Sequence, residues 1–521
     1  MKFNIITLTS RSITIELINQ EAYFAKNPYD LFINGEKVMD GILSNVISYY
    51  DLLPDTDYEI SVIDKNTQEN STQSIRTLKE SVCLDVRKFG AKGDGLHFDS
   101  PSIQAAILSC PKNGRVYIPA GTYLCAPIFL KSDMTLEIAE GACLMGHTDR
   151  GVYPILPGYT LTTDEQDEYY LGTWEGNPLD AYASLITGIH VENVAIIGKG
   201  IIDGNAQNSD WWVNPKIKKV AWRPRTVFLK GCKNVTLQGI RVQNSPSWTL
   251  HPYFSEELSF IDMTVQNHKD SPNTDGLDPE SCNQVRIIGV NFSVGDDCIA
   301  IKAGKLYMGR KHKKPSENFV IRNCQMKHGH GAVVLGSEMA GGIRNIEVSQ
   351  CIFEKTDRGL RIKTRRGRGK DAIIDHIHFR QIKMKEVLTP FVMNMFYFCD
   401  PDGKSEYVWT KEKLPVDEWT PLLGSFTFRD IECIDSEVAA AYFFGLPEQP
   451  IQEVRMENVF IQFKENAQSG QPAMMSFADS VCKKGIVAEN VARIYLKNVR
   501  IEGYVGEYKE LKNVDEIVEE E

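Results

Sequence analysis

Short runs of β-branched and aromatic residues recur through most of the chain, and each follows an asparagine or another polar residue. Apolar and polar side chains alternate within the runs, as in strands that bury one face. Corresponding apolar positions lie as little as 27 residues apart, from Phe319 to Ile346, or as much as 50, from Val235 to Val285. The shorter interval suits one coil of a solenoid, and the longer ones imply inserted loops or an additional coil. We therefore predict an all-β, right-handed parallel β-helix (solenoid) over residues 83–521.

Residues 1–82 follow a different pattern. Segments such as SITIELIN and DYEISVID alternate apolar and polar residues between Asn-Gly and Pro-Asp turns, which is typical of a small β-sandwich. The stretch LLPDTDYEISV resembles the fibronectin type III signature, and Tyr58 stands where that family has a tyrosine corner. We predict a fibronectin type III-like domain here and assign it no chemistry.

A helix is expected where the second domain begins. Ser100 is a suitable N-cap, Pro101 suits the first helical position, and Ile103, Ala106 and Ile107 fall on one face. Such a helix can cover the open apolar end of the solenoid.

Composition narrows the functional classes. The net charge of −11 argues against a nucleic-acid partner and gives no support to a role at a membrane surface. The first twenty residues show no secretion signal, so we expect a cytoplasmic protein unless such a signal was removed. Twelve cysteines without CxxC spacing favour reduced, buried thiols over disulfides or a zinc site.

Three carboxylates are the main candidates for chemistry: Asp275 in NTDG, and Asp296 and Asp297 in GDDC. The adjacent like charges of Asp296 and Asp297 oppose each other's ionisation and raise one pKa. One protonated acid beside charged ones is what cleavage of an acetal such as a glycosidic bond requires. The same dipeptides also occur in ordinary turns, so they do not establish catalysis alone.

Two further motifs follow at about one coil each: GHG, with His330, and RIK, with Arg361 and Lys363. The ordered set NTD, GDD, GHG and RIK closely resembles the polygalacturonases of glycoside hydrolase family 28, and most of all bacterial exo-polygalacturonases with an N-terminal fibronectin type III-like domain. Upstream, FGAKGDG, YIPAGTY, IIDGNAQNSDWW and NSPSWTLHP extend the resemblance to roughly residues 85–503.

The resemblance implies a pectin-degrading enzyme that hydrolyses α-1,4-galacturonosidic bonds of polygalacturonate and oligogalacturonides with inversion. Asp296 is then the proton donor, while Asp297 and Asp275 activate water from a distance of about 6.5–9.5 Å. His330 is expected to orient or tune the acid, although by itself it could be a hydrogen-bonded core histidine. No metal or other cofactor is expected.

The same resemblance points to residues that bind the substrate. Arg361 and Lys363 are expected to contact a galacturonate carboxylate. Trp248 could equally be an aromatic residue stacked inside the solenoid, and the aromatic neighbours of Tyr397 leave its register open. The remaining residues expected to bind the substrate are Asn273, Lys302 and His251.

Basic residues cluster in residues 302–314 and 361–370. Two such loops beside the acids predict a local positive field that suits an anionic polymer; the alternative is two solvated loops. Long insertions at residues 150–183 and 396–422 are expected to close one end of the cleft, which favours cleavage from a chain end.

Two other functions stay open at this point. A pectate-lyase-like β-elimination shares the fold and the anionic substrate, and a non-catalytic, carbohydrate-binding β-helix shares the fold alone. The oligomeric state is not predicted.

Overall fold

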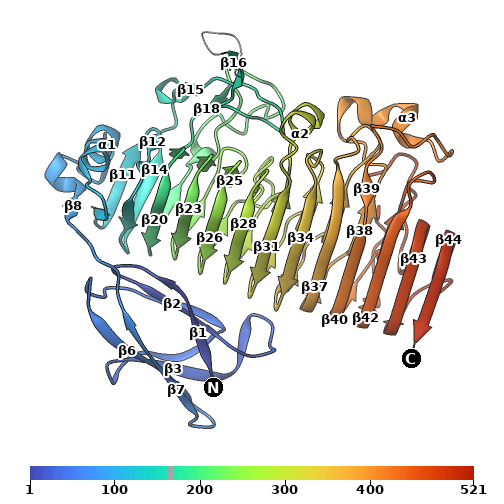
Figure 1. The fold of residues 1–521 in the computed structure, drawn as a ribbon, viewed down its shortest axis with the longest axis horizontal. Helices are drawn as coiled ribbons and strands as arrows, with labels where there is room; N and C mark the ends of the chain where they lie inside the picture. The colour runs from blue at the N-terminus through green and yellow to red at the C-terminus, as the bar shows by residue number, and fades with distance from the viewer. Residues whose placement is uncertain (162–167, 521) are drawn as a thin grey trace.

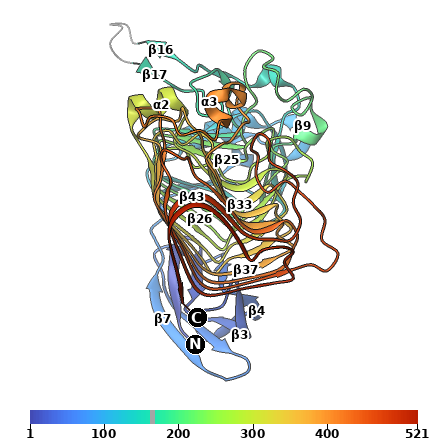
Figure 2. The same cartoon turned by 90° about the vertical axis from the view of Figure 1, so that its right-hand side faces the viewer.

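The computed structural model describes residues 1–161 and 168–520. Figure 1 shows a long solenoid of stacked strands with a small domain beneath its N-terminal half. In the end-on view, this domain lies on the side of the solenoid opposite the loops that carry the short helices α2 and α3 (Figure 2). The predicted all-β fold with a parallel β-helix is confirmed.

The N-terminal domain is a sandwich of two antiparallel sheets. One contains β1 (Phe3–Leu8), β2 (Ile13–Leu17) and β5 (Val46–Tyr49), and the other contains β4 (Glu36–Ser44), β3 (Phe24–Ile33), β6 (Asp57–Asp64) and β7 (Asn70–Arg76). The Tyr58 hydroxyl accepts a hydrogen bond of 2.9 Å from the Leu53 N–H, as a tyrosine corner requires. The sandwich ends at Arg76, and the first strand of the solenoid begins at Cys83.

The solenoid consists of three parallel sheets. Sheet A contains β8 (Cys83–Asp85), β10 (Gly114–Ile118), β13 (Met134–Ile138), β20 (Glu192–Gly198), β23 (Lys233–Gln238), β26 (Glu256–Ile261), β28 (Asn283–Ile288), β31 (Ser316–Arg322) and β34 (Ile343–Ser349). Sheet B contains β9 (Asp94–Phe98), β11 (Gly121–Cys125), β14 (Ala142–Gly146), β21 (Ile201–Asp203), β24 (Arg241–Gln243), β27 (Thr264–Gln266), β29 (Asn291–Ser293), β32 (Gln325–Lys327) and β35 (Ile352–Glu354).

Sheet C forms the third side. It contains β12 (Ile128–Phe129), β19 (Ile186–Ile189), β22 (Val227–Lys230), β25 (Leu250–Tyr253), β30 (Asp297–Ile301), β33 (Gly331–Gly336), β36 (Arg358–Lys363), β38 (Thr389–Asn394) and β41 (Ala439–Phe444). Single bridges at Leu277 and Glu280 connect β25 with β30. The last coils use long strands that continue both sheet A and sheet B, and one of them, β43, also pairs with β41 of sheet C. These strands are β37 (Ile373–Lys385), β40 (Ser425–Ser436), β42 (Ile451–Phe463), β43 (Lys484–Glu502) and β44 (Lys509–Glu520).

The repeats predicted from the sequence are stacked coils. Phe319 pairs with Ile346, and Ile346 pairs with Ile377, so these apolar side chains line up in the core. The 50-residue interval from Val235 to Val285 contains an additional coil, because Leu258 of β26 pairs with both of these residues.

The polar residue before many strands has a structural role. Asn318 and Asn345 adopt φ values of 62° and 56°, a left-handed conformation that asparagine tolerates better than most residues. The Asn318 side-chain amide donates to the Asn283 side-chain oxygen at 2.8 Å, and the Asn345 amide donates to Asn318 at 3.2 Å. This ladder holds the turns of neighbouring coils in register.

The two ends of the solenoid are protected in different ways. Helix α1 (Ser100–Ser109) has Asp99 as its N-cap, one residue before the predicted cap, and it buries Ile103 and Ile107 fully. At the other end, the outermost strand β44 is mostly exposed and rich in charged residues, which discourages pairing with another sheet edge.

Short elements occupy the loops. They are α2 (Leu306–His312), α3 (Glu406–Trp409), the 3₁₀ helices η1 (Val86–Phe89), η2 (Arg150–Val152), η3 (Ala206–Asn208) and η4 (Pro401–Lys404), and the strands β15 (Ile155–Leu156), β16 (Thr160–Leu161), β17 (Glu168–Tyr169), β18 (Ala181–Tyr182) and β39 (Leu422–Leu423). None of the helices in the described ranges is both long and apolar enough to cross a membrane.

A polar interface attaches the sandwich to the solenoid. Glu16 accepts two hydrogen bonds of 2.7 Å from Arg322 and one of 2.7 Å from Asn323. The Gln238 side chain donates to the Thr14 hydroxyl at 2.6 Å. A two-point contact between guanidinium and carboxylate fixes orientation as well as distance, so the sandwich is held against the solenoid in one orientation.

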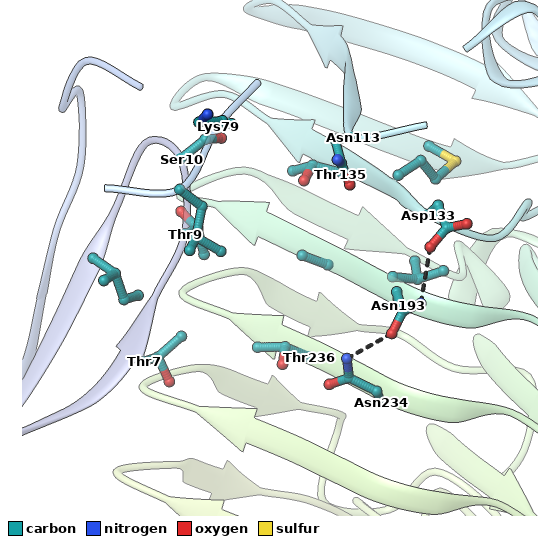
Figure 3. A pocket seen from close by; sticks show the side chains of 15 residues that line it. Thr7, Thr9, Ser10, Lys79, Asn113, Asp133, Thr135, Asn193, Asn234 and Thr236 are labelled. Carbon is teal, nitrogen blue, oxygen red and sulfur yellow. Dashed lines mark hydrogen bonds between the residues drawn. The ribbon is translucent and has the colours of Figure 1, made fainter. Parts of the chain in front are cut away.

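A cavity of about 250 Å³ remains at the N-terminal end of this interface (Figure 3). Threonine, serine and asparagine side chains line much of it, among them Thr7, Thr135 and Thr236. Its hydrogen bonds run from Asn193 to Asp133 and from Asn234 to Asn193, each at 2.8 Å. None of the residues predicted to act in catalysis lines it.

Candidate active site

A second cavity, of about 470 Å³, lies on the outer face of sheet C. Except for His251, all predicted site residues line it: Asp275, Asp296, Asp297, His330, Arg361, Lys363, Asn273, Lys302, Trp248 and Tyr397. Residues one coil apart in sequence are neighbours in space because parallel strands stack in register. The solenoid therefore brings together motifs that lie up to about a hundred residues apart in the chain.

A bend at the start of β30 directs the adjacent carboxylates of Asp296 and Asp297 toward this cavity. Gly295 permits the bend, since a Cβ atom there would lie 2.6 Å from the His268 carbonyl oxygen. The Asp297 N–H donates to a carboxylate oxygen of Asp296 at 3.0 Å. One oxygen each of Asp275, Asp296 and Asp297 lie within 4.8 Å of one another.

Two cations hold the buried Asp297 in its charged form. Arg361 Nη1 lies 3.2 Å from one carboxylate oxygen, and Lys363 Nζ lies 2.6 Å from the other. Burial alone raises the pKa of Asp297, but the attraction of Lys363 and Arg361 outweighs it and lowers the pKa below its usual range.

The pKa values of the other two acids, Asp275 and Asp296, are raised instead. Burial raises the pKa of Asp296, and the negative charge of Asp297 raises it further. Burial also raises the pKa of Asp275 well above its usual value, with contributions from Asp278 and Asp296. The cluster can therefore keep a proton on Asp296 or Asp275 while Asp297 stays charged, which is the separation of roles that acid–base chemistry needs.

The spacing of these carboxylates corrects one expectation. The proton donor and the water-activating acids were expected to be about 6.5–9.5 Å apart, but one oxygen of each acid lies within 4.8 Å of the others. Parallel strands are only about 4.8 Å apart, so acids at the same end of neighbouring coils come closer than acids on opposite walls of an open cleft.

His330 is exposed beside the acids and is not a core histidine. Its Nδ1 lies 2.9 Å from Asp357 Oδ2, and its backbone N–H donates to the Asp296 carbonyl at 3.1 Å. The hydrogen bond to Asp357 raises the pKa of His330, against the effect of burial. A positively charged imidazole next to Asp296 in turn opposes the rise in the pKa of that acid.

Lys302 and Trp248 form another part of the wall. Lys302 Nζ lies 4.5 Å from the centre of the Trp248 ring and 3.1 Å from Glu338 Oε2. The Trp248 and Trp174 rings stack with their centres 6.5 Å apart, and the Arg225 guanidinium lies beside them, 4.9 Å from the first centre and 5.0 Å from the second. Trp248 is thus a stacked aromatic residue that also lines the cavity, so the two roles considered for it are compatible.

His251 was expected to contact substrate, and the structure contradicts this. Its side chain is fully buried, and its Nε2 lies 3.0 Å from Glu280 Oε2. Burial lowers the pKa of His251 well below its usual value, and the charges of Arg225 and Lys302 lower it further. The side chain supports the sheet under the cavity and has no surface to offer a ligand.

The positive field predicted from residues 361–370 is also mostly wrong. Arg366 is buried and makes hydrogen bonds of 2.5 and 2.8 Å to Glu448. Arg365 pairs with Asp402 at 2.7 Å, and Arg368 pairs with Asp400. These guanidinium groups are therefore neither solvated nor free for a ligand; they hold the cavity wall together.

Both long insertions reach the cavity, through Glu175 and Asp400. Lys305 connects them, because its Nζ lies 3.1 Å from Asp400 Oδ1 and 3.9 Å from Glu175 Oε2. The Lys305 N–H also donates to the Gly176 carbonyl at 3.0 Å. Part of the first insertion, residues 162–167, lies outside the described residues.

Some residues of the cavity were missed in the sequence. Arg358 begins β36, the strand that contains RIK, and Asp357 directly precedes it, so their position could have been inferred from the motif. Glu175 and Lys216 come from loops without a motif, and no local signal places them at the site. The other missed residues that line the cavity are Ser337, Glu338, Cys399, Asp400 and Met474.

Comparisons with known families agree with the motifs. The model for glycosyl hydrolases family 28 matches residues 132–473, more than half of the chain. The chain belongs to this family. A model described as rhamnogalacturonase A/epimerase, pectate lyase-like, matches residues 83–137. The polygalacturonase resemblance stated from the sequence is therefore confirmed, and the protein is a polygalacturonase-type glycoside hydrolase.

Individual relatives show the same relationship. A probable polygalacturonase from Vitis vinifera is 30% identical over 390 residues, covering 73% of this chain and 74% of the relative. An exo-poly-alpha-D-galacturonosidase from Dickeya chrysanthemi is 28% identical over 72% of this chain and 67% of the relative. The structure of a family 28 exopolygalacturonase from Yersinia enterocolitica matches 99% of this chain and 98% of its own, with a TM-score of 0.70 and 21% identity, which establishes the fold alone.

Proposed function

We propose that the protein hydrolyses α-1,4-galacturonosidic bonds of polygalacturonate and oligogalacturonides, and that it does so from the non-reducing end of the chain. The observation that carries the proposal is the carboxylate cluster. Asp296 and Asp275 have raised pKa values, whereas Asp297 has a lowered one. The family's polygalacturonase activity supports the substrate class.

In this proposal Asp296 is the general acid. It is partly exposed to the cavity, and its raised pKa keeps it protonated where an ordinary aspartate is charged. It gives its proton to the glycosidic oxygen as the bond to the anomeric carbon breaks. In the reactive form the proton of the cluster is on Asp296, and Asp275 and Asp297 are both charged and hold the attacking water. The proton of that water passes to Asp275, the more basic of the two carboxylates, as the oxygen bonds to the anomeric carbon.

We propose inversion at the anomeric carbon. Carboxylates only about 5–5.5 Å apart suit a covalent intermediate in retaining enzymes, and the observed spacing alone does not exclude that route. Asp297 is nevertheless a poor nucleophile, because Arg361 and Lys363 occupy both of its oxygens and lower its pKa. Attack by a held water molecule is the step that this pairing favours.

Recognition of the substrate carboxylate falls to the cations around the cluster. Arg361 and Lys363 pair with Asp297, yet each keeps further N–H donors that can turn to an incoming carboxylate. Lys302 has the Trp248 ring beside it and Glu338 as its partner. These three cations line one cavity with the acids, so a galacturonate unit can contact both groups at once.

Cleavage from a chain end is supported by the cavity wall. Lys305 ties Glu175 of the insertion at residues 150–183 to Asp400, near the start of the insertion at 396–422, and Trp174 stacks on Trp222 at 4.7 Å. A chain that cannot pass through this wall presents only its end. The Dickeya relative, which carries an exo-acting name, supports the same mode.

The test uses hexagalacturonate labelled at its reducing end. Exo action from the non-reducing end releases unlabelled galacturonate or its dimer and leaves a ladder of labelled products that shorten one step at a time. The viscosity of a polygalacturonate solution then falls slowly. An early viscosity collapse with mixed oligomers would reject exo action while leaving hydrolysis in place.

Calcium-dependent β-elimination is the second candidate, because three carboxylates with oxygens within 4.8 Å form a group that could hold a metal ion. The pairing of both Asp297 oxygens with cations argues against it. A lyase forms an unsaturated product that absorbs ultraviolet light, and a chelator stops it. We expect no such product and no loss of activity with EDTA.

A cytoplasmic location is part of the proposal. It is supported by the twelve cysteines, all of which are free thiols in the structure, as is usual in a reducing compartment. Cell fractionation tests it directly.

A further inference from the structure

The outer face of sheet C continues past the cavity toward the C-terminal coils. Two strands beyond β36, Tyr442 stands in register with Arg361, and Phe444 stands in register with Lys363. Residues in register on neighbouring parallel strands point to the same side of the sheet. Tyr442 and Phe444 therefore face the same side as the cations of the candidate active site.

Aromatic side chains surround a further cavity there, of about 650 Å³. We call it the aromatic groove and define it by Trp409, Tyr442, Phe444, Met475 and Phe477. The rings of Tyr442 and Phe444 stack at 4.3 Å, and those of Trp409 and Phe477 meet edge to face at 5.4 Å. Phe477 is 83% exposed, although a large apolar ring gains from burial.

The charge of the groove differs from that of the catalytic cavity. Lys411 lies 3.0 Å from the centre of the Phe396 ring, and its amine donates to the Met475 sulfur at 3.0 Å. Burial lowers the pKa of Lys411 to about 7. The other lysine of the groove, Lys484, pairs with Glu510. Three more carboxylates, Glu406, Glu412 and Asp479, line it.

We propose that the aromatic groove binds uncharged sugar residues, namely methyl-esterified galacturonate, on the reducing-end side of the bond that is cut. This inference rests on the proposed function. Aromatic faces pack against the C–H faces of a pyranose ring, and carboxylates accept hydrogen bonds from its hydroxyl groups. A run of free uronates would meet more acids than cations here, whereas esterified residues meet no such repulsion.

The groove adjoins the catalytic cavity, and the segment at Met474 and Met475 lies between them. The Met474 sulfur lies 2.7 Å from Arg361 Nη2 and lines the cavity, while the next residue, Met475, lines the groove. A chain that leaves the cavity crosses only this short segment, whose unbranched side chains adapt readily to a ligand.

The distance between the catalytic acids and the aromatic groove sets the length of oligosaccharide that can reach both. Four strand-to-strand steps lead from β30 through β33, β36 and β38 to β41. At about 4.8 Å for each step, the groove begins roughly 19 Å from the catalytic acids. A trisaccharide held at the acids cannot reach it, but a heptasaccharide can.

The test compares two heptagalacturonates of equal length, one fully acidic and one methyl-esterified on its four reducing-end residues. Trigalacturonate serves as the substrate that does not reach the groove. We expect the esterified heptamer to have a KM about 3- to 10-fold below that of the acidic one. Phe477→Ala should remove this advantage without changing KM or kcat for trigalacturonate, because it removes one stacking ring. The matched control is Tyr504→Ala, another exposed aromatic residue outside the groove.

Equal KM values for the two heptamers in the wild-type protein would overturn the inference. So would an equal effect of Phe477→Ala on trigalacturonate and on the esterified heptamer, which would place the ring at the acids. If no galacturonate oligomer is hydrolysed at all, the proposed function fails instead. Calorimetric titration with the esterified heptamer then tests the groove alone: binding that Phe477→Ala weakens supports it, and no binding rejects it.

Discussion

The outer face of sheet C carries two regions that share one scaffold and differ in chemistry. β30 contributes Asp297 to the first region and β36 contributes Arg361 and Lys363. Over β41 the residues in register with these two cations are Tyr442 and Phe444. The backbone pairing is the same in both. The coil thus determines where a side chain points, and the residue at each position determines what the region binds.

The cations of the two regions show the difference most clearly. Lys363 lies 2.6 Å from a carboxylate oxygen of Asp297, and so helps to set the pKa of a buried acid. The Lys411 amine lies over the Phe396 ring, and the pKa of Lys411 itself is lowered. The sequence alone does not distinguish the two lysines, although only Lys363 is placed to pair with a carboxylate.

The largest expected effect comes from Asp296→Asn. Loss of the general acid should lower kcat by about 10²- to 10⁴-fold and leave the binding of oligogalacturonate near that of the wild type. Initial rates and calorimetric titration measure the two quantities. The matched control is Asp270→Asn, at an exposed aspartate just before the NTD motif, which should keep full activity. A rate above about a tenth of the wild type would remove Asp296 from the acid role.

Lys363→Ala tests the charged region next. It removes one partner of Asp297 and one donor to the substrate carboxylate, so KM should rise about 10- to 100-fold, as expected for loss of a charge-assisted hydrogen bond. Lys370→Ala, at an exposed lysine of the same basic run, should change little. Added salt should also raise the wild-type KM. Similar kinetics on neutral galactose oligomers would contradict recognition of the carboxylate.

The pH profile gives a third test. Asp296 must be protonated to act, so kcat should fall as the pH rises through its raised pKa. His330→Ala removes a positive charge that lowers this pKa. The alkaline limb of the profile should therefore move to higher pH, while kcat drops about tenfold. His268→Ala, at an exposed histidine outside the cavity, should leave the profile unchanged. A shift to lower pH would contradict the assigned charge of His330.

The smallest effect is expected at Lys411. Lys411→Met should change the KM for acidic heptagalacturonate at most about threefold, because a lysine that lies against an aromatic ring and has a lowered pKa contributes little to charge recognition. This small change in KM is to be compared with the much larger rise expected for Lys363→Ala. A tenfold rise in KM would show that the groove recognises free uronates and would merge the two regions into one anionic site.

Much of the fold and of the site could be predicted from the sequence, since a solenoid turns sequence intervals into spatial neighbours. Phe319 and Ile346, 27 residues apart, pair as expected. By the same logic Asp297 meets Gly331, next to His330, one strand along. The bend that turns both Asp296 and Asp297 toward the cavity could be predicted from the glycine before them.

The rest depended on contacts that no local pattern encodes. The basic run at 361–370 looks uniform, yet Arg361 meets Asp297, whereas Arg366 meets Glu448 from a loop 82 residues away. Glu175 reaches the cavity only through the path of a long insertion. His251 sits in a motif, but its strand turns it toward Glu280 inside the protein.

One measurement addresses the central claim, that the carboxylate cluster hydrolyses galacturonosidic bonds with inversion. Proton NMR of trigalacturonate, recorded from the first minutes after mixing with the protein, reports the bond type, the product and its anomeric form together. We predict a β-configured reducing end that appears before mutarotation, no signal from an unsaturated sugar, and no reaction with Asp296→Asn. An unsaturated product, an α-configured first product, or undiminished turnover by Asp296→Asn would contradict the account.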